Sequence, residues 1–177
     1  MLAHRNARVQ IGRMSTRLTA ILAAIAAALV LGAALASEYW GGLVPCPLCL
    51  WERHPYRAAI AFGALGAVLP PRFARPALWL LVLVMLAGVV LGVTHVGVEW
   101  KFWPSPLPQC GGPDLSGLSI AERLARMPAI PAKPCDEPTY LIPFLPVSMA
   151  MMNLLASLAI AAGTAFYLRQ DTLRNKP

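Results

Sequence analysis

Four cysteines form two pairs in a chain that is otherwise largely apolar. Cys46 and Cys49 lie in the sequence Val-Pro-Cys-Pro-Leu-Cys-Leu-Trp-Glu-Arg, whereas Cys110 and Cys135 stand toward the two ends of a long polar stretch. A Cys-X-X-Cys pair can exchange between dithiol and disulfide, and the thiolate is the reactive form in that exchange. Two pairs in one chain therefore predict a relay that passes a disulfide from one pair to the other.

Arg53 and His95 are polar side chains that could assist the first pair. If a helix begins at Cys49, its backbone amides point toward that sulfur and Arg53 follows one turn later, so we expect Cys49 to be the reactive thiolate. Arg53 could instead be an interfacial arginine paired with Glu52 or with a lipid phosphate. His95 fits either a hydrogen-bonded histidine inside a helix bundle or a polar contact to a bound cofactor.

No metal site is expected at the first pair. Cys46 and Cys49 offer two ligands, and a structural zinc ion takes four. His54 is the single further candidate in suitable spacing, so the pattern favours redox chemistry over zinc binding.

The composition places the chain in a lipid bilayer. Of its 177 residues, 58% are hydrophobic and only 13% are charged, with a mean hydropathy of +0.60. The net charge of +7 comes from basic residues beside apolar segments, which is typical of topology signals and of contact with anionic lipid. We therefore expect membrane lipid as a partner and no nucleic acid.

Helical spans are predicted over 18–37, 77–98 and 143–168, each long enough to cross a hydrocarbon core of about 30 Å. Ala34-Leu35-Ala36 resembles a signal-peptidase site, but the apolar stretch before it is longer than a signal peptide needs, so we expect the first span to be retained. The predicted fold is a single all-α membrane domain over 1–177.

A fourth span over 49–69 is harder to place. Residues 58–69 are too few to cross alone, so the helix must begin near Cys49 and carry Glu52, Arg53, His54 and Arg57 at interfacial depth. A proline is tolerated in the first turn of a helix, but at the position of Pro55 we expect it to kink or delay this one. With this span the chain forms a four-helix transmembrane bundle.

The distribution of basic residues predicts the orientation. Arginine and lysine gather in 1–17, 70–76 and 169–177, which should face the cytoplasm together with both termini. External loops over 38–48 and 99–142 then carry both cysteine pairs. In a bacterial inner membrane these loops lie in the oxidising periplasm.

The longer external loop is expected to follow the membrane surface. Trp100 and Trp103 are placed where aromatic side chains sit at headgroup level. Ser119 to Glu122 forms a capping box that opens a short helix ended by Pro128, with Ile120, Leu124 and Met127 on one face, and we expect this helix to lie parallel to the membrane. For Cys110 and Cys135 alone, an inert disulfide staple is an equal alternative, and four cysteines allow three pairings.

The order of these features resembles the family of disulfide bond formation protein B, called DsbB, a quinone-linked membrane thiol oxidase. The first pair follows the first span, and the second pair lies in the last external loop. The motifs that carry the resemblance are the segment 45–53 around the first pair, His-Val-Gly-Val-Glu at 95–99, Trp-Pro-Ser-Pro at 103–106 with Cys110, and Cys135-Asp136 before the last span.

The resemblance implies a role for each cysteine. A reduced periplasmic DsbA-like thiol oxidase would attack the Cys110–Cys135 disulfide at Cys110, and Cys135 would then attack Cys46. Cys49 would be released beside ubiquinone or menaquinone, which accepts the electrons. By the same resemblance Arg53, and less directly His95, belong to the quinone site.

Two other interpretations stay open beside this one. A tetraspan structural protein would use its disulfides only to staple the external loops, and they would stay oxidised. A vitamin K epoxide reductase-like quinone reductase also uses four helices, but that family places its Cys-X-X-Cys near the end of the last span. Here the motif follows the first.

Overall fold

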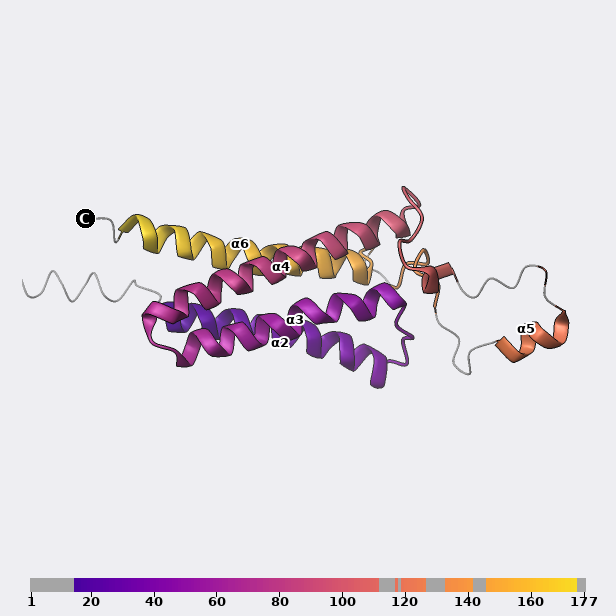
Figure 1. Cartoon of the computed structure of the whole chain (residues 1–177), viewed down its shortest axis with the longest axis horizontal. Coiled ribbons are helices and arrows are strands. Elements are labelled where there is room, and N and C mark those ends of the chain that lie inside the picture. The colour runs from indigo at the N-terminus through magenta and orange to yellow at the C-terminus, as the bar shows by residue number, and fades with distance from the viewer. Residues whose placement is uncertain (1–14, 112–116, 118, 127–132, 142–145, 175–177) are drawn as a thin grey trace, which may run out of the picture.

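The computed structural model describes residues 15–111, 117, 119–126, 133–141 and 146–174. Long helices run side by side over most of this length, and the loops that carry the cysteines lie at one end of them (Figure 1). The elements, in chain order, are α2 (Thr16–Tyr39), α3 (Pro47–Val68), α4 (Pro71–Glu99), the 3-10 helix η1 (Pro108–Gly111), α5 (Ile120–Arg126) and α6 (Met149–Arg174).

The prediction of an all-helical fold is confirmed for the described residues. Three helical segments are long and apolar enough to cross a membrane, namely Thr16–Tyr39, Arg72–Glu99 and Met149–Leu173. Helix α3 is not among them, because its first half carries Glu52, Arg53 and Arg57. A span through α3 stays a prediction.

Helix α3 begins at Pro47, two residues before the predicted start at Cys49. Pro47 occupies the first helical position, where its fixed φ suits the helix and its missing N–H costs nothing. Cys46 is the N-cap residue. The expected delay at Pro55 is wrong, since the helix begins at Pro47 and runs through this buried proline to Val68. A kink at Pro55 stays a prediction.

The other long helices also differ from the predicted ranges at their ends. Helix α4 begins at Pro71 and includes Pro76, so it starts before the predicted residue 77. Helix α6 begins at Met149 and continues to Arg174, later at both ends than the predicted 143–168, and 142–145 lie outside the described residues. In the loop, α5 ends at Arg126, and the predicted stop at Pro128 also lies outside them.

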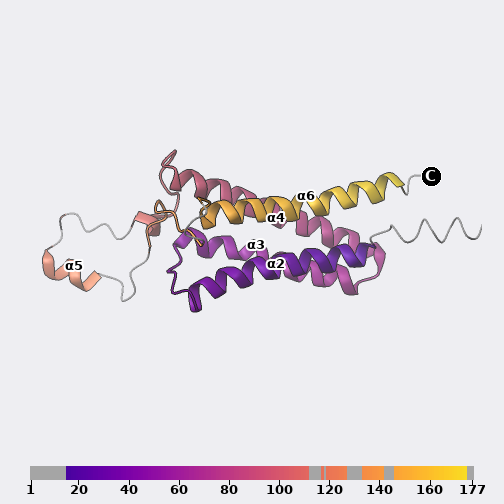
Figure 2. The ribbon, with the colours of Figure 1, turned by 180° about the vertical axis from the view of Figure 1, so that it is seen from behind.

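Small residues let the helices approach closely. A Cβ on Gly63 of α3 would lie 2.7 Å from the Cβ of Ala24 of α2, and one on Gly92 would lie 3.0 Å from Leu154 of α6. Such contacts are the usual means of helix association where lipid, not water, surrounds the bundle. Figure 2 shows α2 against α3 and α4 against α6 from behind. Many large apolar side chains of these helices, such as Leu29, are exposed.

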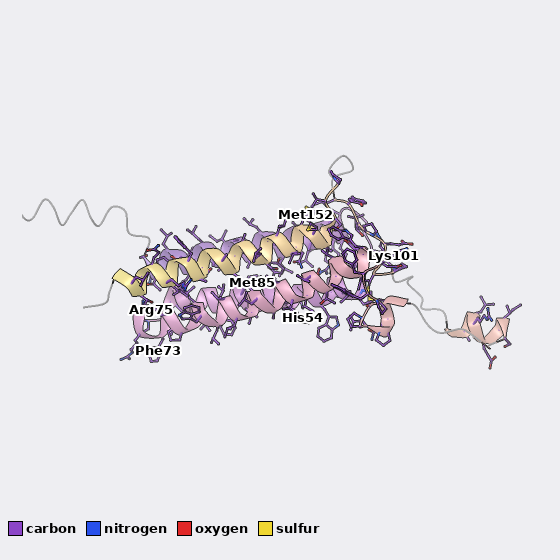
Figure 3. The ribbon with its side chains drawn as sticks, turned by 90° about the horizontal axis from the view of Figure 1, so that it is seen from above. His54, Phe73, Arg75, Met85, Lys101 and Met152 are labelled. Atoms are coloured by element: carbon purple, nitrogen blue, oxygen red, sulfur yellow. A yellow bond between two sulfur atoms is a disulfide. The ribbon has the colours of Figure 1, made fainter. Side chains whose placement is uncertain are left out.

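An ion pair links α4 to α6 at the end of the bundle opposite the cysteines. Arg75 Nη2 of α4 lies 2.7 Å from Asp171 Oδ2 of α6, and the same nitrogen donates a hydrogen bond to Thr172 Oγ1. Figure 3 shows Phe73 and Arg75 at this end, Met85 midway, and Lys101 and Met152 toward the other end. The segments that contain the four cysteines and the basic connection between α3 and α4 thus lie at opposite ends of the bundle.

The turn after α4 folds Trp103 back onto the helix. Its indole Nε1 donates to the Thr94 carbonyl at 3.1 Å, and Lys101 adopts a φ of 61° as the chain reverses. The ring lies so close to Gly97 that a Cβ there would overlap it. Glycine is therefore the residue that fits beneath Trp103.

Replacing Gly97 with Ala should destabilise the protein. The added methyl group must displace the Trp103 ring and its hydrogen bond, at a cost of about 1–3 kcal/mol, which thermal unfolding in detergent would register. Gly163→Ala is the matched control, because no atom lies within 4 Å of a Cβ at that helical position. Equal melting temperatures for the two variants would contradict this packing.

Candidate functional site

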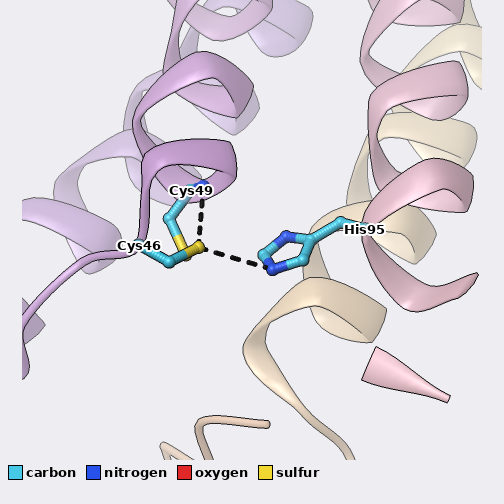
Figure 4. Close-up of side chains that lie close together, drawn as sticks. All are labelled: Cys46, Cys49 and His95. Carbon is cyan, nitrogen blue, oxygen red and sulfur yellow. Dashed lines mark hydrogen bonds between the residues drawn. The ribbon is translucent and has the colours of Figure 1, made fainter. Parts of the chain in front are cut away.

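The first cysteine pair lies at the start of α3, where a backbone N–H of the helix contacts one of its sulfurs. The Sγ atoms of Cys46 and Cys49 lie 2.6 Å apart, and the backbone N–H of Cys49 donates to Cys46 Sγ at 3.1 Å (Figure 4). The side-chain and backbone hydrogen bonds from Cys49 lower the pKa of Cys46, against the opposing effect of burial. The sequence predicted that the first backbone amides of the helix point toward Cys49 Sγ. The helix starts two residues earlier, so Cys46 is the N-cap and its sulfur accepts the hydrogen bond.

The second pair is joined and packs against the first. Cys110 and Cys135 form a disulfide, and Cys46 and Cys49 are free thiols. Both members of the second pair are buried beside the first pair, in one cluster that also contains Leu48 of α3 and Val98 of α4. Residues far apart in the sequence therefore gather at one end of the bundle, as a relay requires.

A cavity of about 250 Å³ opens beside Cys49. Its walls are mostly apolar side chains from α2, α6 and the segment before α3, such as Leu31, Val44 and Met152. Cys46 is not among the lining residues, so within the first pair Cys49 alone faces the cavity. A mostly apolar wall with a few polar groups is typical of a site for a lipid-soluble small molecule.

Arg53 lines this cavity and reaches back to α2. Its Nη1 atom lies 2.6 Å from Glu38 Oε2, and the Arg53 side chain is 9% exposed. The pairing with Glu52 that the sequence allowed is not the one in the structure. The Nε atom of Arg53 is buried and has no hydrogen-bond partner among the described residues, so a donor is left for an occupant of the cavity.

Asn153 supplies a second unused donor on the cavity wall. Its Nδ2 atom is also buried without a partner among the described residues. Tyr56 holds this part of α6 in place, because its hydroxyl contacts the Asn153 carbonyl at 3.1 Å and Ser157 Oγ at 2.8 Å. The cavity therefore combines one thiol with two unpartnered N–H donors.

His95 lies at the first pair instead of lining the cavity. Its Nε2 atom is 3.5 Å from Cys46 Sγ (Figure 4). Its Nδ1 atom is 3.1 Å from Glu52 Oε1, and the His95 and Glu52 side chains are both buried. Donor atoms of Cys46, Cys49 and His95 lie within 4.8 Å of one another, which is a possible ligand set for a metal ion. That no metal binds here stays a prediction.

Sequence reasoning did not assign a role to Glu52 or Asn153. Glu52 contacts His95 and also lines the cavity, and Asn153 carries a buried amide nitrogen in the otherwise apolar first turns of α6. A signal existed for both, because an acid or an amide inside an apolar helix is costly unless it has a partner. The partner itself could not be named from the sequence, since it comes from another helix.

A second hollow borders the Cys110–Cys135 disulfide. Its walls include Phe102, Trp103 and Pro104 with Lys101 and Asp136 at the sides. The aromatic and charged side chains beside a disulfide offer a contact surface for a chain that approaches it.

The chain matches the model of one protein family over residues 16–167, described as disulfide bond formation protein DsbB. Several relatives carry the description disulfide bond formation protein B, and three of them show the range of similarity. The one from Xanthomonas oryzae pv. oryzae is 34% identical over 60% of this chain and 63% of its own length. The relative from Chromohalobacter salexigens is 31% identical over 58% of this chain and 61% of its own length. The one from Pasteurella multocida is 26% identical over 82% of this chain and 86% of its own length.

The chain thus spans less than two thirds of the Xanthomonas and Chromohalobacter relatives in these matches. No solved structure matches the chain. The resemblance seen in the sequence motifs is confirmed by the family match, which covers most of the chain.

Proposed function

Because the chain belongs to the family of disulfide bond formation protein DsbB, we propose that it is a membrane oxidoreductase that passes electrons from a soluble DsbA-type thiol oxidase to a membrane quinone. The observation that carries this proposal is the position of Cys49. This thiol belongs to a pair that packs against a disulfide, and it also faces an apolar cavity containing Arg53. A thiol between a disulfide and a cavity can receive electrons from the disulfide's partner and deliver them to a molecule bound in the cavity.

The cavity suits a quinone, either ubiquinone or menaquinone. A quinone has two carbonyl oxygens that accept hydrogen bonds, and Arg53 Nε and Asn153 Nδ2 are two buried donors without partners in the described structure. When bound, a quinone supplies an acceptor for two electrons and two protons. Arg53 would orient it and favour negative charge on both the Cys49 sulfur and a quinone oxygen.

The relay proposed for the cysteines begins at the disulfide that the structure contains. A thiolate of the soluble partner attacks Cys110, and the released Cys135 thiolate attacks Cys46 once the first pair is oxidised. Cys49 then leaves as a thiolate facing the cavity. The partner's second thiolate frees Cys110, which attacks Cys135, re-forms the Cys110–Cys135 disulfide and releases Cys46. Once protonated, Cys46 and Cys49 are two free thiols that together hold two electrons. The shared packing of both pairs around Leu48 and Val98 supports this order, because the Cys135 step needs the two pairs in contact.

We further propose that α3 is a fourth span, with the cysteine loops in the periplasm and both termini in the cytoplasm of a bacterial inner membrane. The charged residues of α3 are the obstacle, and two of them have partners on neighbouring helices. Glu52 contacts His95 of α4, and Arg53 contacts Glu38 of α2. Such pairing lowers the cost of placing these side chains at membrane depth.

Helix α5 is the part of the external loop proposed to lie along the membrane. Ile120 and Leu124 are 79% and 63% exposed, and Glu122 accepts hydrogen bonds from Ser119 as the capping box predicted. The Ser119 hydrogen bonds also lower the pKa of the Glu122 carboxyl. In Figure 1, α5 stands apart from the long helices, which leaves its apolar side chains for lipid.

The observations favour this proposal over the two alternatives. A purely structural role for the cysteines does not explain why Cys46 and Cys49 are free thiols, or why one of them faces a cavity. A vitamin K epoxide reductase-like enzyme would have its Cys-X-X-Cys near the last span, whereas here the motif opens α3.

Replacing Arg53 with Gln should raise the Michaelis constant for quinone by about 10-fold or more, because a charge-assisted hydrogen bond to the ligand is lost. The measurement is quinone-dependent turnover in detergent with a reduced DsbA-type partner. Arg57→Gln is the matched control, since Arg57 is exposed one turn later on the same helix and does not line the cavity. The double variant Glu38→Gln/Arg53→Gln avoids an unpaired Glu38 carboxylate, and an unchanged Michaelis constant in it would remove Arg53 from the site.

A further inference from the structure

Cys46, His95 and Glu52 form a hydrogen-bonded line that ends at the cavity. We propose that this line carries the proton of Cys46 to the bound oxidant, with His95 as the catalytic proton acceptor and Glu52 as the group that hands the proton on. Cys46 Sγ lies 3.5 Å from His95 Nε2, His95 Nδ1 lies 3.1 Å from Glu52 Oε1, and Glu52 lines the cavity. The inference rests on the proposed function for the identity of the oxidant, but its first half concerns only Cys46 and His95.

The chemistry of the three groups sets the direction of the line. A carboxylate only accepts hydrogen bonds, so an ionised Glu52 requires the proton on Nδ1 of a neutral His95. The lone pair on Nε2 then faces the Cys46 thiol. This is the arrangement in which a carboxylate orients a histidine as base for a nucleophile, here with sulfur as the nucleophile.

The line gives the Cys46 proton a route to the cavity that does not pass through Cys49. Cys46 is 3% exposed and is absent from the cavity wall, whereas its partner Cys49 faces the cavity directly. His95 is equally buried, at 3% exposure, so bulk water does not reach the ring. A proton that leaves Cys46 therefore has a direct acceptor in His95.

The proposed step balances as follows. A bond forms between Cys46 Sγ and Cys49 Sγ, both S–H bonds break, and two electrons pass to the quinone. The Cys49 proton enters the cavity directly, while the Cys46 proton moves to His95 Nε2 as the Nδ1 proton moves to Glu52 and on to the cavity. Quinol leaves with both electrons and both protons.

Other ionisable groups also face His95 and enter any pH dependence. Cys49 and Glu52 approach from α3, and Glu99 lies one turn further along α4. Glu99 differs from Glu52 because it accepts a hydrogen bond from Ser148 at 2.5 Å and does not line the cavity. It therefore serves as the matched control, a buried glutamate near His95 that is outside the proposed line.

The first test needs neither quinone nor a soluble partner. In a Cys49→Ala background with the Cys110–Cys135 disulfide intact, the thiolate absorbance near 240 nm reports the ionisation of Cys46. Adding His95→Ala should raise the midpoint of this titration by about 1 pH unit or more. The Cys46 thiolate then loses both its proton acceptor and the positive charge of protonated His95 beside it. Glu52→Gln should shift the midpoint less, and Glu99→Gln least. Identical midpoints in all four proteins would overturn the contact between Cys46 and His95.

The second test follows single-turnover quinone reduction by the prereduced protein. Glu52→Gln should slow the step by about 10- to 100-fold, within the range of general acid–base effects, without changing the quinone concentration at half-maximal rate. The wild-type step should be slower in D₂O, and that isotope effect should change in the variant. Glu52→Asp keeps the charge but withdraws the carboxylate from His95, so its rate should be intermediate. The Glu52→Asp variant therefore tests the proton path through Glu52 if the Glu52→Gln variant does not fold.

The two tests separate the inference from the proposed function. If the wild-type protein reduces no quinone while the Cys46 midpoint depends on His95, the proposed function fails and the Cys46–His95 contact stands. If quinone is reduced at wild-type rate by both Glu52 variants, the path through Glu52 is wrong and the proposed function stands.

Discussion

Cys49→Ala should abolish quinone reduction, with turnover lower by about 1,000-fold or more. The reason is geometric, because Cys49 is the one cysteine on the cavity wall in the described structure, and no other sulfur there can pass electrons to an occupant. The measurement is the loss of quinone absorbance in the presence of a reduced DsbA-type partner.

The Cys49 variant should keep the first half of the relay. Cys110 and Cys135 are still joined, so one equivalent of the partner should be oxidised before the reaction stops. This partial reaction is the internal control for folding. Wild-type turnover in the variant would show that the cavity beside Cys49 is not where electrons leave the protein.

Cys110→Ala should lower the rate of partner oxidation by a similar factor, because it acts at the other end of the relay. The disulfide that the soluble partner is proposed to attack no longer exists, so partner oxidation should fall by about 1,000-fold or more. The measurement is the rate at which the partner's free thiols disappear.

The two cysteine variants should fail at different steps. In Cys110→Ala, the prereduced first pair should still reduce one equivalent of quinone, because Cys46, Cys49 and the cavity are intact. A Cys110→Ala/Cys135→Ala double variant removes the unpaired Cys135 thiol and should behave in the same way. Continued partner oxidation in either variant would mean that the partner reacts directly with the first pair.

Helix α3 shows what local sequence patterns can and cannot predict. An apolar helix next to a Cys-X-X-Cys motif was predictable from residue order, but its first residue was not. Cys46 is the N-cap because Pro47 suits the first helical position and the Cys46 sulfur accepts a hydrogen bond from the Cys49 backbone N–H. This two-residue difference moved the helix N-terminus from one thiol to the other.

The neighbours of Arg53 and His95 depended on packing between helices. The sequence marks both side chains as unusual in an apolar chain, but their partners come from elsewhere, Glu38 for Arg53 and Glu52 with Cys46 for His95. No spacing rule links residues on different helices. The adjacent pair Glu52 and Arg53 therefore looked like an ion pair, while the structure gives each of them a separate partner.

The pairing of the cysteines was open for the same reason. Four cysteines allow three pairings, and Cys110 and Cys135 are 25 residues apart in the chain. Their disulfide, and its packing against the first pair around Val98, depend on how the segment between α4 and α6 folds at the end of the bundle. The resemblance to the DsbB family implied this pairing, whereas spacing alone did not.

The most direct test of the relay is to combine the purified wild-type protein with quinone and a reduced DsbA-type partner in detergent, without oxygen. Quinone absorbance and partner thiols are followed in the same sample. We predict that one quinone is reduced for each partner dithiol oxidised, since each conversion transfers two electrons. Partner oxidation without loss of quinone, or no reaction of either, would contradict the proposed route from the Cys110–Cys135 disulfide to the cavity beside Cys49.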